Sequence, residues 1–407
     1  MNVAKRRWKW ERGDGGGRQA VGVAVETRRP RCGGVGGHDL FANARNDRGS
    51  LGDSRVFAFY RPAMPIREQF SVLLRGESLS SDQAEAFVED VLSGLLDESQ
   101  MGAALALIQA RGASVDELVG GARAMRRHAT MVGVEQLSGT VIDTCGTGGA
   151  RKTFNISTLS AIVTAAAALR GRVRVRVAKH GNRGRSGRGS AEVLAALGVN
   201  IEAGPAVQRR CLDELGVCFC FAVAHHPAMR NAAKTRISLG FPTIFNLLGP
   251  LTNPAGAKRQ VLGVYEPRWV ERVGSALVRL GCERAMVVHS LDGIDEITTT
   301  GPTLIGHVQH GELRLEEFDP SPLGLSRPEL GGLDAVDLPD AVRLAWSVVA
   351  GEASAALDIV LLNSAAALVV GGAAETMAEG LALARAGVAR GEAKRTLEAL
   401  IEITRAG

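Results

Sequence analysis

The chain has 407 residues, of which 45% are hydrophobic and 22% charged, so a wholly disordered or fibrous protein is excluded. The formal net charge of +5 permits a phosphate-bearing ligand, while 4% aromatic residues supply few rings for stacking nucleic-acid bases. The six cysteines include no C-x-x-C pair and do not indicate a disulfide scaffold, so we expect reduced thiols and a cytoplasmic protein.

Residues 1–65 are rich in glycine and arginine and show no sustained hydrophobic period. We therefore predict a disordered extension for this segment. Trp8 and Trp10 lie among basic residues that could contact a nucleic acid or an acidic surface. We favour the alternatives, a solvated tail or a true start at Met64, because short basic clusters are common in tails.

Residues 66–138 show helical patterning. Sequences of the capping-box type begin at Ser80 and Ser114, where a serine is followed three residues later by glutamine or glutamate. Apolar residues between them recur at spacings of three and four. We predict a small helical domain here, joined by helices from about 226–250.

From residue 139 to 407, short β-type runs alternate with alanine-rich helical stretches. This alternation predicts an α/β domain whose central sheet is mostly parallel. The longest apolar run, from Ile359 to Ala374, is interrupted by Asn363 and Ser364 and is interpreted as a buried helix. No run is long and clean enough to span a bilayer, so no membrane partner is expected.

A first glycine loop, GTGG, follows the β-type run VIDTC, and a helix is predicted to begin near Ser157. Glycines let backbone N–H groups converge on an anion, and a helix N-terminus adds partial positive charge. Ser157 or Asn155 could also ligate a hard cation. A P-loop would require glycine where this chain has Arg151. An ordinary strand–helix turn is the remaining alternative.

A second loop, from Lys179 to Glu192, combines cations, glycines and hydroxyls in a way that suits a polyphosphate. For His180 alone, a hydrogen-bonded surface histidine is the alternative. A third loop places Asp295 and Glu296 after the apolar run AMVVHS. If they lie opposite the basic loops they are candidate Mg²⁺ ligands, whereas adjacent acids otherwise face solvent. A paired-carboxylate hydrolase is a weaker interpretation.

A helical segment before residue 250 carries Arg236, which could clamp a carboxylate or form an ordinary surface ion pair. It ends in a rigid turn that begins with Gly249 and Pro250.

These segments occur in a fixed order: GTGG with TFNIST, KHGNR with GSAE, HPAM, TIFNLLGPLTNP, DGIDE and DIVLLNSAAAL. As a set they resemble anthranilate phosphoribosyltransferase, from about Ile66 to the C-terminus. The resemblance implies transfer of phosphoribose from phosphoribosyl pyrophosphate (PRPP) to the amine of anthranilate, the second step of tryptophan synthesis from chorismate. It also implies two Mg²⁺ ions per subunit and a homodimer formed through the helical domain.

The resemblance further implies residue roles. Electrostatic and positioning roles without a nucleophile would fall to Lys179, His180, Asn182 and Arg236. PRPP would be bound by Gly146, Gly149, Ala150, Thr153, Asn155, Ile156, Ser157, Thr158, Lys179, Ser186, Gly187 and Ser190. Anthranilate would be bound by Gly146, His180, Asn182, Arg236, Gly249 and Pro250, with its carboxylate on Arg236. Mg²⁺ would be held by Ser157, Asp295 and Glu296.

The sequence departs from the family pattern at both phosphate loops, which are slightly short, and at Ala150, where the family has aspartate. Residues 169–177 also carry extra arginines. A second hypothesis is therefore a catalytically weak or inactive relative that binds nucleic acid. A third is a pyrimidine nucleoside phosphorylase of related architecture. We prefer the transferase, because a pure binding protein has no need of both Asp295 and Glu296.

Overall fold

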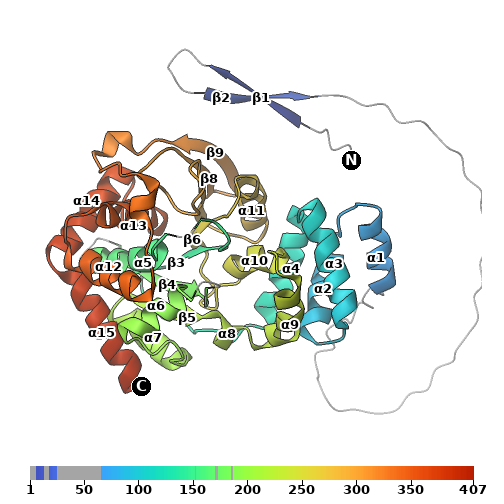
Figure 1. Cartoon of the computed structure of the whole chain (residues 1–407), viewed down its shortest axis with the longest axis horizontal. Helices are drawn as coiled ribbons and strands as arrows, with labels where there is room; N and C mark the ends of the chain where they lie inside the picture. Colours follow the sequence, from blue (N-terminus) through green and yellow to red (C-terminus); the bar gives the residue numbers. More distant parts are fainter. Residues whose placement is uncertain (1–5, 13–17, 25–65, 152, 170–172, 185–186) are drawn as a thin grey trace, which may run out of the picture. The chain divides into compact units, whose positions relative to one another are not determined.

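The computed structural model describes residues 6–12, 18–24, 66–151, 153–169, 173–184 and 187–407 (Figure 1). Met1–Tyr60 and Arg61–Gly407 are separate units. In the first unit, β1 (Arg6–Arg12) pairs antiparallel with β2 (Arg18–Ala24), where the sequence indicated no regular element. Alternating tryptophans in one strand and valines in the other suit such pairing. The rest of the predicted extension, and the predicted site residue Ser186, lie outside the described residues.

The helical part begins with four helices: α1 (Ile66–Leu74), α2 (Ser81–Leu92), α3 (Glu98–Arg111) and α4 (Val115–Arg127). The capping boxes predicted at Ser80 and Ser114 are confirmed, and Asp97 forms a third before α3. Two later helices, α9 (Arg230–Leu239) and α10 (Ile244–Leu248), pack against this group. The chain thus returns to the helical part after it has built three of the seven strands of the sheet.

The sheet has seven strands in the order β5-β4-β3-β6-β7-β8-β9. Their bounds are β3 (Thr140–Gly146), β4 (Val175–Gly181), β5 (Val217–Phe221), β6 (Arg259–Gly263), β7 (Arg284–Ser290), β8 (Thr303–Gln309) and β9 (Glu312–Phe318). All pairs from β5 to β7 are parallel, which confirms the predicted sheet type. The antiparallel β8–β9 hairpin was not predicted; it turns at His310 and Gly311, which both have positive φ.

One face of the sheet is covered by helices from distant parts of the chain (Figure 1). They are α5 (Ile156–Ala168), α13 (Ala355–Gly371), α14 (Met377–Ala389) and α15 (Glu392–Ala406). On the other face, α11 (Arg268–Arg279) packs against β7 and β8, and its core continues into the helical part. The remaining α-helices are α6 (Ser190–Leu197), α7 (Pro205–Glu214), α8 (Ala222–His225) and α12 (Leu338–Ala350).

The central helix α13 is buried along most of its length, including its polar residues Asn363 and Ser364. Within the described ranges no single helix is long and apolar enough to cross a membrane. The pair α12 and α13 reaches that length and composition only together, with a 66° bend between them. Burial of α13 agrees with the interpretation of its sequence as a core helix.

Candidate active site

The candidate site lies at the carboxyl edge of the sheet, where the strand order reverses. From β3 the chain builds outward through β4 and β5, and then returns to the other side of β3 to add β6 and β7. Ligands of open α/β sheets bind at such a switch point. Gly146 at the end of β3 is level with Gly263 at the end of β6. The loops that follow these strands therefore meet.

The first glycine loop is anchored at both of its ends. Gly148 and Gly149 have φ of +61° and +98°, a region that favours glycine, so the GTGG sequence is needed for this turn. The Thr147 N–H donates to Gly263 O at 2.9 Å. Farther along, the Phe154 N–H donates to Leu333 O at 3.1 Å. The loop then enters α5, whose N-terminal N–H groups face the same edge.

The second loop begins with two residues that β3 holds in place. The buried Lys179 donates from Nζ to Thr144 O at 2.5 Å, and the His180 N–H donates to Asp143 Oδ1 at 3.0 Å. The pKa of the Asp143 carboxyl is raised, first by burial, while Lys179 acts in the opposite direction. The orientation of the second loop thus depends on the buried carboxyl group of Asp143 in β3.

The second loop folds back on itself and touches the first. Asn182 O accepts the Ser190 hydroxyl at 3.2 Å, and the exposed Asn182 side chain accepts the Arg183 N–H. Asn155 of the first loop donates from Nδ2 to Arg188 O at 3.2 Å. A Cβ on Gly181 would lie 2.3 Å from Ser190 Oγ, so glycine is required at that position. The structure therefore brings the two predicted phosphate loops together.

The acidic pair contacts the first loop directly. Glu296 Oε1 accepts the N–H of Ser157 at 3.1 Å. Asp295 Oδ2 lies 2.8 Å from where a Cβ on Gly146 would stand. Two hydrogen bonds between the Asn363 side chain and the Ile297 backbone, of 2.8 and 3.0 Å, fix this acidic loop to α13. The three predicted metal ligands thus lie together.

The electrostatics of this group match a cation site. Burial, and then the neighbouring Asp295, raise the pKa of Glu296 to about 8, against the opposing effect of Lys179. Burial also raises the pKa of Asp295, and the Gly148 backbone is among the groups that oppose it. Two carboxylates and a serine hydroxyl are hard oxygen donors of the kind that Mg²⁺ prefers. In the described ranges no group of three His, Cys, Asp or Glu side chains could hold a metal.

At the end of β4, His180 lies beside His226, with 5.2 Å between ring centroids. Burial, and then His226 itself, lower the pKa of His180 well below its usual value. Gly249 and Pro250 form a short 3-10 turn next to them, and the Gly249 backbone opposes that shift. Arg236 lies on α9, with its guanidinium carbon 5.5 Å from the centre of the Phe245 ring.

Several residues that shape the site were not predicted from the sequence. Asp143 is the one acidic residue in the apolar run VIDTC, but nothing in the sequence indicated its function. Asn253 donates from Nδ2 to Ala178 O at 2.7 Å and so attaches the Gly249–Pro250 turn to β4. The Arg151 side chain pairs with Asp334 at 2.9 Å. No local pattern could have indicated that contact across such a separation.

Known proteins share this sequence and fold. The glycosyl transferase family, a/b domain, matches residues 138–394, and the helical bundle domain of the same family matches residues 71–129. The anthranilate phosphoribosyltransferase of Rubrobacter xylanophilus is 44% identical over 343 residues, which cover 84% of this chain and 98% of the relative. That of Phenylobacterium zucineum is 46% identical over 336 residues, which cover 82% and 97%.

Solved structures of anthranilate phosphoribosyltransferases share the fold of this chain. The anthranilate phosphoribosyltransferase of Thermus thermophilus has 38% sequence identity and a TM-score of 0.76, with 82% of this chain and 98% of that chain covered. The Saccharomyces cerevisiae enzyme in complex with PRPP and Mg shares the fold at 24% identity, with a TM-score of 0.75 and coverage of 84% and 98%.

Proposed function

This chain belongs to the anthranilate phosphoribosyltransferase family, and from that premise we propose that the residues at the carboxyl edge of its sheet divide the work of one transfer reaction. The enzyme transfers the phosphoribosyl group of PRPP to the amine of anthranilate, a step of tryptophan biosynthesis that releases pyrophosphate. The assignment of individual residues below is our proposal.

PRPP binds across the two glycine loops. The backbone N–H groups of the first loop and the α5 N-terminus receive phosphate oxygens, while Lys179 and the second loop add positive charge. The hydrogen bond from Asn155 to Arg188 O supports this assignment, because it holds the loops close enough to contact one ligand. Ala150 and Thr153 belong to the same surface.

Mg²⁺ is held by Ser157, Asp295 and Glu296, and we propose two ions per subunit. The S. cerevisiae relative, solved with PRPP and Mg, supports the choice of metal. When bound, Mg²⁺ supplies positive charge that stabilises the departing pyrophosphate. The contact between the Ser157 N–H and Glu296 Oε1 is the observation that carries the proposal, because it joins the anion loop to the acidic pair.

The chain's own residues then position the acceptor. The bond from ribose C1 to pyrophosphate breaks, the anthranilate nitrogen bonds to C1, and the nitrogen loses one proton to solvent. Arg236 takes the anthranilate carboxylate, Asn182 also contacts anthranilate, and Gly249 and Pro250 border its ring. His180 stays neutral, because its lowered pKa disfavours the imidazolium.

The test is the loss of anthranilate fluorescence in the presence of PRPP and Mg²⁺. The double variant Asp295→Asn/Glu296→Gln should lower kcat/KM by roughly 100- to 1,000-fold, because the charge facing the leaving group is lost. Glu312→Gln, an exposed change on β9, is the matched control and should retain full activity. A folded double variant with control-like kcat/KM would refute the metal assignment.

We also propose a cytoplasmic homodimer formed through the helical part. Leu74 and Leu95 are each 72% exposed and Ile237 is 80% exposed, and all three belong to that part of the chain. Exposed apolar side chains mark an interface when they form one contiguous patch, and we propose that these three meet in the dimer contact. Light scattering on the purified chain tests the dimer, and Leu74→Asp with Ile237→Asp should yield monomers.

A further inference from the structure

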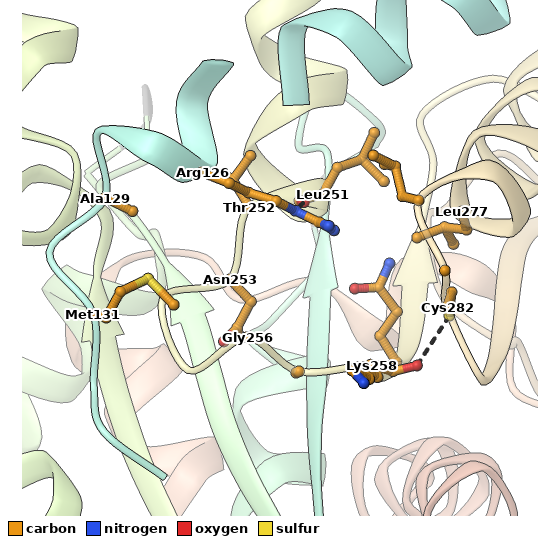
Figure 2. Close-up of a pocket in the computed structure, with 14 residues that line it drawn as sticks. Arg126, Ala129, Met131, Leu251, Thr252, Asn253, Gly256, Lys258, Leu277 and Cys282 are labelled. Carbon is orange, nitrogen blue, oxygen red and sulfur yellow. Dashed lines mark hydrogen bonds between the residues drawn. The ribbon is translucent and has the colours of Figure 1, made fainter. Parts of the chain in front are cut away.

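A pocket of about 160 Å³ lies between the helical part and the sheet, and Asn253, which attaches the Gly249–Pro250 turn to β4, is among the residues that line it (Figure 2). Its floor includes Lys258 and Gln260 at the start of β6, and Gly281 and Cys282 directly before β7. The floor is therefore formed at the amino ends of these two strands. Its walls come from the end of α4 and the segment after it, and from the turn that leads into β6. It therefore lies where the helical part joins the sheet.

The pocket offers hydrogen-bond donors and positive charge. Arg126 extends across it from α4, and its Nε donates to Leu251 O at 2.8 Å (Figure 2). Arg126 is an exposed residue, and its two terminal nitrogens have no hydrogen-bond partner among the described residues, so they are open to solvent or to a ligand. Gln260 is 3% exposed, and its buried Nε2 has no partner in that same part. An unpaired buried donor is costly, so a ligand that accepts from it is favoured.

The charge of the lining has one sign. Its fourteen residues include Arg126 and Lys258 and no aspartate or glutamate; Lys258, whose side chain is 70% exposed, pairs at 4.0 Å with Glu283 just outside the lining, so Arg126 is the main source of charge. Cys282 does not supply a negative charge, because burial raises the pKa of its thiol to about 11. The ligand that these groups select is an anion.

The other walls are apolar, which narrows the class of anion. Met131, Leu251, Leu277 and Leu280 line the pocket around the polar groups. A cavity of about 150 Å³ holds a molecule of the size of benzene. We propose that this pocket binds a small organic carboxylate, whose oxygens accept from Arg126 and Gln260 while its apolar body packs against the leucines.

The probe ligand is sodium benzoate. Its binding is detected by NMR on the full chain, labelled with ¹³C in the methyl groups of methionine. The methyl of Met131 borders the pocket and lies 3.9 Å from where a Cβ on Gly256 would stand. Benzoate should shift this resonance in a saturable manner, with a dissociation constant on the order of 1 mM for so small a ligand. Met101, buried in the helical part, should not shift.

Matched variants assign the binding to the pocket. Arg126→Gln should weaken binding about tenfold or more, since it removes a charge-assisted contact. Arg123→Gln, an exposed position on the same helix that pairs with Glu85, should leave binding unchanged. Gln260→Leu provides a second loss-of-contact variant if Arg126→Gln does not fold.

Benzoate could also enter the acceptor site, so the Met131 shift should persist in Arg236→Gln. Inorganic phosphate serves as a second probe, and it should not shift Met131, because it has no apolar body. The proposal is overturned if benzoate gives no saturable shift, if Arg126→Gln and Gln260→Leu bind as the parent does, or if phosphate binds more tightly than benzoate.

Discussion

His226, next to His180, illustrates how burial sets the protonation of a single residue. Its ring is 6% exposed and lies against His180. Burial, and then the neighbouring His225, lower the pKa of His226 to about 4 from its usual 6.5. The unfolded chain therefore binds a proton between these two values that the folded chain does not. Stability is complete above pH 6.5 and is lost as the pH falls toward 4.

This linkage gives a measurable pH dependence. Between pH 7.5 and pH 5, the free energy of unfolding of the parent should fall by about 2 kcal/mol more than that of His226→Asn. Urea unfolding at both pH values measures the difference. His310→Asn is the control, because His310 is exposed and asparagine tolerates its positive φ. Equal losses in the parent and His226→Asn would refute the linkage.

At the residue scale, the sequence predicted those site residues that lie in short, recognisable motifs. Strand-end geometry predicted Asp295 and Glu296 opposite the basic loops, and the family resemblance added Ser157 to them; the structure shows Glu296 in contact with the Ser157 N–H. The roles of Asp143 and Asn253 escaped prediction, since a buried polar residue reveals its partner only once the strands are paired. The functions assigned to Arg236 and Asn182 stay predictions.

Among the elements, α14 and α13 pack closely at one glycine. A Cβ on Gly380 would lie 2.6 Å from the backbone oxygen of Ala365 and 2.9 Å from its Cα. Backbone atoms cannot rotate away, so an added methyl must push the helices apart. Overpacking of this kind costs roughly 1–3 kcal/mol, more than the approximately 1 kcal/mol that alanine gains over glycine in a helix.

Gly380→Ala should therefore lower the free energy of unfolding, although alanine is the better helix former. The expected net loss is about 1 kcal/mol, measured by urea unfolding. Ala382→Gly, at an exposed position of α14, reports the helix propensity alone and should also lose about 1 kcal/mol. A stabilised Gly380→Ala would mean that the two helices separate at little cost.

Elements whose signals are local could be predicted, and those fixed by distant partners could not. The capping boxes at Ser80 and Ser114 depend on residues three positions apart, and both form. The β8–β9 hairpin was missed because His310 and Gly311 form a short turn between strands of mixed polarity. The strand order depends on the chain crossing back past β3 before it adds β6. No single sequence segment contains a signal for that crossing.

At the scale of the whole molecule, residues 61–407 form a unit that contains the sheet, the helical part, the candidate active site and the pocket beside Arg126. A chain that begins at Met64 should therefore fold and keep kcat/KM within about twofold of the parent. The fluorescence assay with both chains measures this. Lost activity in the shorter chain would assign the first segment a role in the transfer. Salt-dependent binding of DNA by the longer chain alone would assign that segment the nucleic-acid role considered above.

The position of α13 has a consequence for how the protein is made. This helix covers one face of β3, β6 and β7, yet it ends at Gly371, long after the last of these strands has been synthesised. A ribosome that adds about 5–20 residues per second leaves that apolar face uncovered for several seconds. During that interval the nascent chain presents its future core to other proteins. We therefore expect chaperones in the cell to bind stalled nascent chains that end before α13.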